Sequence, residues 1–287
     1  MRLSKLLLPV DLSERSIGAA HYAKALASHF GSEVIIAHAF ELRSAYFVSP
    51  EMGPDPDWYE ARREEAQHAL DDFQVDEFRG LPVRRMLLQG DVAGAIVDLA
   101  HAEQVDVIVM PTHGYGPFRR FLVGSITAKV LHDADCPVLT GVHIAKAPPL
   151  EAIVFRRVVC AVDFDASGER ALRWAAQFAA EFQAGLTVVH ALPDPGAGEA
   201  HFLDQTLPMA LAQSARELME ELLKRVGVSA ESVIEPGAVA DVVRSAGIAV
   251  AADLVVIGRH ESAGLLGRLR ANAYAIVRES PCPVVSV

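Results

Sequence analysis

The chain has 287 residues, enough for two ordinary domains, and its composition of 51% hydrophobic and 22% charged residues is typical of packed cores rather than disorder. The formal net charge of −11 disfavours non-specific binding to nucleic acid, and no run of about 18 apolar residues occurs, so we expect neither nucleic acid nor membrane as a partner. Three cysteines without a CxxC pair or an even disulfide framework predict a cytoplasmic protein without a zinc site.

The first half of the chain alternates short apolar runs with stretches of helical periodicity. The apolar runs predict strands at residues 6–10, 34–39, 83–88, 105–110 and 138–142. Helical periodicity predicts helices at residues 17–30, 93–101 and 125–133, and the acidic stretch 58–73 predicts a helix with a solvated face. Runs that are apolar throughout are typical of a parallel sheet covered on both faces, so this alternation predicts a doubly wound α/β domain.

The second half of the chain repeats the first. The stretch around Asp11, LLLPVDLSERS, resembles VVCAVDFDASG around Asp163, and the two halves end in DCPVLT and PCPVVSV. We therefore predict two tandem domains, each with a five-stranded, mostly parallel sheet and helices on both faces. The predicted domains cover residues 1–145 and 156–287, and the linker 146–155 contains two consecutive prolines.

The loops that follow the strands are the expected place for a ligand, because doubly wound sheets bind ligands beyond the carboxyl ends of their strands. Asp11 follows the first strand, Gly90 follows the third, and residues 111–116 follow the fourth, so these loops would meet at one edge. Gly124 and Ser125 then open the last helix, and the unpaired N–H groups of a helix N-terminus favour an anion such as phosphate.

Several other kinds of site are not indicated. The chain contains no GxxxxGK[ST] P-loop, no GxGxxG fingerprint, and no HxxxH or HExxH metal motif, and we identify no catalytic residue. His38 and His190 occupy matching strand positions and are predicted to be structural, whereas His113 lies in a loop that would face a ligand. Asp11 has a second interpretation as the N-cap of a capping box with Glu14, which is compatible with ligand contact.

The segment VMPTHGYGPFRRFLVGSIT, residues 109–127, makes the resemblance specific. The whole chain resembles two fused universal stress protein domains, whose fold is adenine-nucleotide alpha-hydrolase-like, or Rossmann-like. The ATP-binding subgroup of that family carries G-x2-G-x9-G-[ST] after the fourth strand and an aspartate after the first. Here Gly114 and, nine residues on, Gly124 and Ser125 match the motif, while Pro111 stands at its first glycine and removes one backbone N–H.

The resemblance implies an ATP site in the first domain, with or without Mg²⁺. Asp11 would contact the adenosine, Ala39 would offer its backbone to adenine, and the start of the last helix would meet the phosphates. The expected site residues are Pro9, Asp11, Ala39, Gly90, Met110, Pro111, Thr112, His113, Gly114, Gly124, Ser125, Ile126 and Thr127. The loop 44–57 after the second strand would cover this site as a lid.

The second domain departs further from the motif, in the stretch IGRHESAGLLGRLRANAYAIV. Gly258 fills the first position, but Glu261 replaces the second glycine, and Ala271 with Asn272 would replace Gly-Ser. A carboxylate about 4 Å from a phosphate costs roughly 4 kcal/mol at an effective dielectric of about 20. We therefore expect no ATP binding of the family type in this domain, although Asp163 persists.

These features predict a cytoplasmic stress-response protein that binds ATP as a regulatory ligand in its first domain. The resemblance implies that the domains pair as a pseudo-dimer through their last strands and that the chain self-associates, as in a homodimer. One alternative is an enzyme that slowly hydrolyses ATP or transfers a nucleotidyl group at the same site. Another is a scaffold in which Pro111 disables the site and which binds partner proteins or an apolar ligand.

Overall fold

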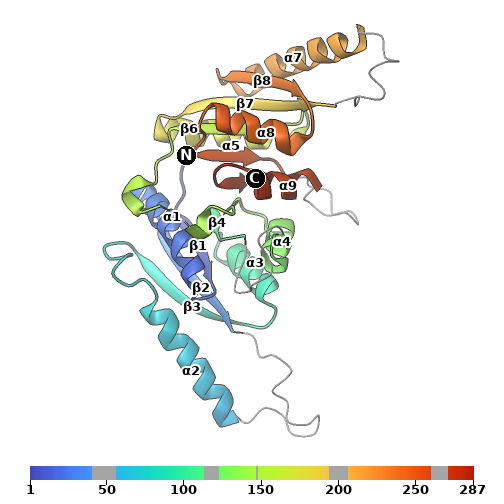
Figure 1. The fold of residues 1–287 in the computed structure, drawn as a ribbon. Coiled ribbons are helices and arrows are strands. Elements are labelled where there is room, and N and C mark those ends of the chain that lie inside the picture. Colours follow the sequence, from blue (N-terminus) through green and yellow to red (C-terminus); the bar gives the residue numbers. More distant parts are fainter. Residues whose placement is uncertain (41–55, 113–122, 147, 194–205, 260–270) are drawn as a thin grey trace, which may run out of the picture. The chain divides into compact units, whose positions relative to one another are not determined.

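The chain folds into two units, seen in a computed structural model that describes residues 1–40, 56–112, 123–146, 148–193, 206–259 and 271–287 (Figure 1). The N-terminal unit is Arg2–Ile153, and the C-terminal unit is Val154–Val287 together with Met1. The division between the units lies within residues 146–155, the segment predicted from its prolines to be a linker.

The N-terminal unit is an α/β domain with a parallel sheet. Its elements are β1 (Lys5–Val10), α1 (Glu14–Phe30), β2 (Glu33–Phe40), α2 (Pro56–Asp72), β3 (Val83–Gln89), α3 (Val92–Ala102), β4 (Val107–Val109), α4 (Ser125–Asp133), β5 (Val138–Thr140) and the 3₁₀ helices η2 (Ile144–Lys146) and η3 (Leu150–Ala152). The strands lie in the order β3-β2-β1-β4-β5, and each neighbouring pair is parallel. Leu6, Leu7 and Leu8 of β1 are fully buried, as expected for a strand covered on both faces.

The strand order reverses beside β1. The chain moves outward from β1 to β2 and β3, then returns to β4 on the other side of β1. Because crossovers between parallel strands are right-handed, this order places α1 and α2 on one face of the sheet and α3 and α4 on the other (Figure 1). The gap between the carboxyl ends of β1 and β4 is therefore a topological switch point.

The C-terminal unit has the same topology. Its elements are β6 (Arg157–Ala161), α5 (Ala166–Phe182), β7 (Gly185–Leu192), α7 (Thr206–Val226), β8 (Glu231–Pro236), α8 (Val239–Ala249), β9 (Leu254–Ile257), α9 (Ala271–Glu279) and β10 (Val284–Ser286). The strands lie in the order β8-β7-β6-β9-β10, again with parallel neighbours. The predicted fold class and tandem repeat are thereby confirmed.

The start of α1 corrects the predicted capping box. The N-cap is Ser13, whose side chain accepts from the N–H of Arg15, so Asp11 lies two residues before the cap. Leu12 has a φ of +60°, a left-handed turn that separates Asp11 from the helix. The capping role predicted for Asp11 is therefore wrong, and its carboxylate instead accepts hydrogen bonds from Ser13 and Ser16.

Helix α9 corrects the alignment of the two repeats. Both α4 and α9 have nine residues, and the buried set Thr127, Val130 and Leu131 of α4 recurs in α9 as Ala273, Ile276 and Val277. Ser125 therefore corresponds to Ala271, and Ile126 to Asn272. The match of Gly-Ser to Ala271 and Asn272 expected from the sequence was wrong by one position, because the repeat offset falls from 147 between Asp106 and Asp253 to 146 between α4 and α9.

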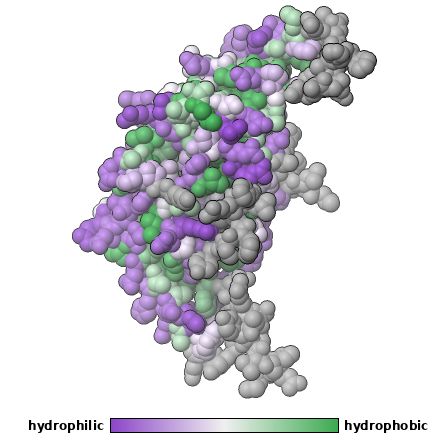
Figure 2. Space-filling view, in the orientation of Figure 1, coloured by the Kyte–Doolittle hydropathy of each residue, from purple (hydrophilic) through white to green (hydrophobic). Residues whose placement is uncertain are grey.

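On the face in Figure 2, hydrophilic residues predominate over the described surface, and hydrophobic residues are interspersed in small groups. Within the described ranges, no helix combines the length and the apolar character needed to cross a membrane. All three cysteines are free, and burial raises the pKa of the Cys282 thiol to about 12, so that thiol is protonated at neutral pH.

Candidate functional site

A cavity of about 170 Å³ lies at the switch point of the N-terminal unit. Its walls come from the carboxyl ends of β1 and β2, the residues after β4, and the first turns of α1, α3 and α4. It is lined by Pro9, Val10, Asp11, Ser16, Ala37, His38, Ala39, Val92, Ile96, Met110, Pro111, Ile126 and Thr127. This is the place where doubly wound sheets bind their ligands.

The predicted site residues fall into three groups. Those that line the cavity are Pro9, Asp11, Ala39, Met110, Pro111, Ile126 and Thr127. Those that are described but do not line it are Gly90, Thr112, Gly124 and Ser125. His113 and Gly114 lie outside the described residues, as does almost all of the predicted lid, residues 44–57.

Sequence reasoning missed almost half of the lining. The missed residues are Val10, Ser16, Ala37, His38, Val92 and Ile96. Most are apolar residues in strands or helices, and their pattern is that of ordinary core positions. Their place in the predicted fold could have identified them. A cavity at the carboxyl edge of the sheet must be lined by the last residues of the strands and by the first turns of the helices that follow.

Asp11 is held by two serine hydroxyl groups. Its Oδ1 accepts from the hydroxyls of Ser13 at 2.6 Å and Ser16 at 2.7 Å and from the N–H of Ser13 at 3.0 Å. Desolvation alone would raise the pKa of Asp11, but these hydrogen bonds together outweigh it and hold the pKa below its usual value. The carboxylate is therefore ionised at neutral pH, and none of the described groups donates to its Oδ2, which keeps its capacity to accept hydrogen bonds.

The N-terminus of α4 is fixed beside the cavity by two hydrogen bonds. The N–H of Gly124 donates to the carbonyl of Thr112 at 2.8 Å, and the buried hydroxyl of Thr127 donates to the carbonyl of Pro111 at 3.0 Å. The N-cap residue Gly124 supplies no side-chain hydrogen bond to the first turn. The first-turn N–H groups of α4 thus keep the anion-binding capacity of an uncapped helix start.

His38 makes the same hydrogen bond as its counterpart in the second repeat. Its Nδ1 lies 2.8 Å from the carbonyl oxygen of Val10, and the Nδ1 of His190 lies 2.9 Å from that of Val162. A carbonyl oxygen only accepts, so Nδ1 carries the proton in both rings. The predicted structural role of both histidines is confirmed, and His38 in addition presents its ring to the cavity.

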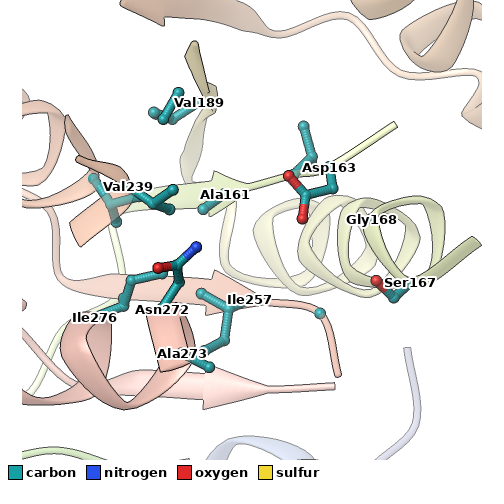
Figure 3. Close-up of a pocket in the computed structure, with 14 residues that line it drawn as sticks. Ala161, Asp163, Ser167, Gly168, Val189, Val239, Ile257, Asn272, Ala273 and Ile276 are labelled. Carbon is teal, nitrogen blue, oxygen red and sulfur yellow. The ribbon is translucent and has the colours of Figure 1, made fainter. Parts of the chain in front are cut away.

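The C-terminal unit has a smaller cavity, of about 70 Å³, in the equivalent place (Figure 3). Its lining includes Asp163 after β6, Gly258 after β9, and Asn272 and Ile276 of α9. In Figure 3 the side-chain amide of Asn272 points from α9 toward Ala161 at the end of β6. The second repeat therefore keeps the aspartate of the first site and places a polar amide side chain where the apolar Ile126 lies in the first.

The described residues of the two cavities offer few groups that bind metals or anions. Among the described residues, no group of three or more histidine, cysteine or carboxylate side chains is placed to hold a metal ion. Among the described residues that line the two cavities there is no lysine or arginine. In the described part of the N-terminal site, an anion would therefore meet backbone N–H groups and the start of α4.

Comparison with known proteins agrees with this architecture. The model of the universal stress protein family matches residues 3–140 and 155–287. A universal stress protein of Methanocaldococcus jannaschii is 32% identical over 148 residues, which is 51% of this chain and 84% of that protein. A universal stress protein of Thermus aquaticus is 34% identical over 135 residues, which is 47% of this chain and 95% of that protein.

Solved structures show the same fold over the full length. The crystal structure of a universal stress protein from Archaeoglobus fulgidus covers 100% of this chain and 98% of its own, with a TM-score of 0.74 at 23% identity. At that identity the likeness supports the fold alone. Because the family model matches each of the two repeats nearly from end to end, the chain belongs to the universal stress protein family and consists of two such domains in tandem.

Proposed function

We propose that the N-terminal unit binds ATP as a regulatory ligand and that the chain acts in a cytoplasmic stress response. The observation that carries this proposal is the layout of the 170 Å³ cavity, which has the Asp11 carboxylate at the end of β1 and the start of α4 along another wall. An acceptor for sugar or base donors and an anion-favouring helix end thus border one cavity at the switch point.

The remaining walls suit a flat, largely apolar group. Pro9, Ala37, Ala39, Val92 and Ile96 line the cavity with small or branched apolar side chains. Ligand sites of this kind combine an apolar lining with a few placed polar groups. An adenine ring would lie among these side chains, its sugar would donate to Asp11, and its phosphates, with or without Mg²⁺, would extend toward Gly124 and Ser125 of the family motif.

Pro111 is the main departure from the motif of ATP-binding relatives. It is buried and lines the cavity, and it offers no N–H to a ligand. Its carbonyl, however, accepts from the Thr127 hydroxyl, which ties the end of β4 to the first turn of α4. We propose that this tie keeps the helix start in place and that ATP binds with one backbone donor fewer.

The C-terminal unit is proposed to be a fused partner that does not bind ATP. Its cavity is smaller, and its sequence replaces the second motif glycine with a glutamate. In this proposal the two domains pair as the subunits of a dimer would, and the chain self-associates further. Its ligand, if it has one, differs from that of the first unit.

The proposal is tested by identifying the small molecule that co-purifies with the protein, by mass spectrometry, and by calorimetric titration with ATP. We expect about one ATP per chain. Gly124→Glu should abolish binding, because a carboxylate at the start of α4 would repel the phosphates at the point where the N–H groups face them.

Gly124→Ala is the matched control, because it also adds a side chain at the N-cap but no charge, and it should retain more affinity than Gly124→Glu. Circular dichroism of both variants checks that the fold is intact. If the Gly124→Glu variant still bound ATP, the proposed phosphate site at the start of α4 would be wrong. Steady product formation from ATP would favour the enzyme alternative, and a co-purified apolar molecule without any response to ATP would favour the scaffold.

A further inference from the structure

We infer that Lys129 contacts the phosphates of the bound nucleotide and makes the N-terminal cavity prefer ATP to less charged adenine ligands. In the structure, the Lys129 ammonium donates to Asp91, which directly precedes the lining residue Val92. This inference rests on the proposed function, and it assigns to Lys129 a role that the family motif does not contain.

The position of Lys129 follows from the geometry of α4. Lys129 lies three residues after Ile126, which lines the cavity, and residues three apart share one side of a helix. Helical side chains lean toward the N-terminus, so the lysine stem runs back along α4 toward Ser125. A half-exposed ammonium thus belongs to the same side of α4 as Ser125, at the helix start proposed to meet the phosphates.

The partner of Lys129 lies at the same edge of the cavity. Its Nζ is 2.5 Å from Oδ2 of Asp91, which directly precedes the lining residue Val92. The same Oδ2 accepts from the N–H of Gly94 at 3.0 Å, so Asp91 also caps α3. Because the cap does not depend on the lysine, Asp91 would keep its place when the ammonium turns to a phosphate.

The described charges of the site are consistent with a role for a lysine. Asp11 contributes a carboxylate, the chain has a net charge of −11, and the described lining contains no lysine or arginine. A helix N-terminus supplies only about half a positive charge, and Pro111 has removed one N–H donor. A nearby ammonium would offset part of the charge of a triphosphate that the helix alone does not balance.

The second repeat provides an internal comparison. Asp91 corresponds to Ala238, the N-cap of α8, which makes no side-chain hydrogen bond to its helix. In the register that matches α4 to α9, Lys129 corresponds to Ala275. Both members of the ion pair are therefore alanine in the domain whose phosphate motif is degenerate, as expected if the pair serves the phosphates.

A purely structural role makes a different prediction. If the pair only holds α3 and α4 together, removing either partner would disturb the cavity walls. The affinities for ATP, AMP and adenosine would then fall by the same factor. If Lys129 contacts phosphate, its removal should lower the affinity most for the ligand with the most phosphate charge. Removal of the Asp91 charge should not lower the affinity for any of the three. The two roles are thus separable by comparing two variants and three ligands.

The experiment is calorimetric titration of ATP, AMP and adenosine into wild type, Lys129→Met and Asp91→Asn. We expect Lys129→Met to lower the affinity for ATP about tenfold, since one charge-assisted hydrogen bond is lost. The affinity for AMP should fall less, and the affinity for adenosine should not change. Asp91→Asn should bind ATP at least as tightly as wild type, because asparagine also caps helices and a negative charge is gone.

Lys24→Met is the matched control. It removes the same charge from the same unit, but Lys24 lies on α1, where it pairs with Glu77 at 3.3 Å and does not line the cavity. Its ATP affinity should equal that of wild type. Thermal melts of all variants establish that each is folded.

The outcomes separate the two proposals. If folded wild type binds no adenine ligand, the proposed function fails and this inference falls with it. If wild type binds ATP but Lys129→Met keeps the wild-type ratio of ATP to adenosine affinity, the inference alone is overturned. Equal weakening of all three ligands by both Lys129→Met and Asp91→Asn would also overturn it and would assign the pair a structural role.

Discussion

The ionisation of Asp11 is controlled by its two neighbouring serines. A carboxylate with a lowered pKa stabilises the folded state above the pKa of the unfolded chain, near 3.8, and this contribution is lost as pH falls through the lower pKa of the folded state. At neutral pH the contribution is therefore fully present. Asp11 is exposed enough for solvent to screen its interactions, so we expect a contribution of about 1 kcal/mol.

Ser16→Ala should raise the pKa of Asp11. The change removes the 2.7 Å hydroxyl donor while the desolvation that opposes ionisation remains. The pKa can be measured by following the side-chain carboxyl resonance of Asp11 by NMR as a function of pH. Ser28→Ala, at an exposed position near the other end of α1, is the control and should leave the titration unchanged. An unchanged Asp11 titration in Ser16→Ala would contradict the role given to this hydroxyl.

Single residues at the site were only partly predictable from the sequence. Asp11 was found because an aspartate directly after the first strand lies at the carboxyl edge of the sheet. The sequence did not show that Asp11 lies outside the helix cap. Its position depends on the left-handed conformation of Leu12, which is rare for a residue with a side chain. Ser16 was missed for the same reason, because only this turn brings its hydroxyl to the carboxylate.

Among the elements, α1 and the 3₁₀ helix η2 approach each other backbone to backbone. A Cβ atom at Gly18 would lie 1.8 Å from the carbonyl oxygen of Ile144, a distance that no side chain tolerates. Ile144 is fully buried, and His21 Nδ1 lies 3.2 Å from the carbonyl oxygen of Pro148. The segment after β5 is therefore packed on α1 and is part of the N-terminal unit.

Gly18→Ala should destabilise the N-terminal unit by about 2 kcal/mol. Alanine favours a helix over glycine by roughly 1 kcal/mol, but overpacking against a fixed carbonyl costs roughly 1–3 kcal/mol or more, and the clash should dominate. Denaturant unfolding measures the change. Gly185→Ala is the control, because its new Cβ would lie 3.8 Å from the nearest atom, the carbonyl oxygen of Arg156. A Gly18→Ala variant more stable than wild type would show that the contact is not as close as described.

Elements with strong local signals were predictable, and those defined by tertiary contact were not. Helix α4 has the predicted bounds, 125–133, because a glycine and a serine precede a clear helical period. The fourth strand is Val107–Val109 and thus shorter than the predicted 105–110, since the N–H of Val105 closes the end of α3 on Ala100. The packing of η2 and η3 on α1 leaves no periodic trace in the sequence, so η3 and the last residue of η2 were predicted as part of the linker 146–155.

At the scale of the whole molecule, the two repeats share one fold but differ in the residues of their cavities. Both repeats keep the aspartate after the first strand and the histidine that bonds to the strand beside it. The second repeat lacks the ion pair between α3 and α4 and has the smaller cavity. The retained groups maintain the sheet edge, whereas the groups that differ are those proposed to meet the phosphates.

ATP should therefore protect the two units unequally in hydrogen–deuterium exchange. A ligand at about 100 times its Kd stabilises the state that binds it by about 2.7 kcal/mol, so the slowest amides of β1 and β2 should exchange about 100-fold more slowly with ATP. Amides of the equivalent strands β6 and β7 should change far less, because the second cavity lacks the ion pair and the Gly-Ser start of its last helix. Lys129→Met at the same ATP concentration should reduce the protection of β1 and β2. Equal protection of both units, together with two ATP per chain in calorimetry, would show instead that the second cavity binds the nucleotide too.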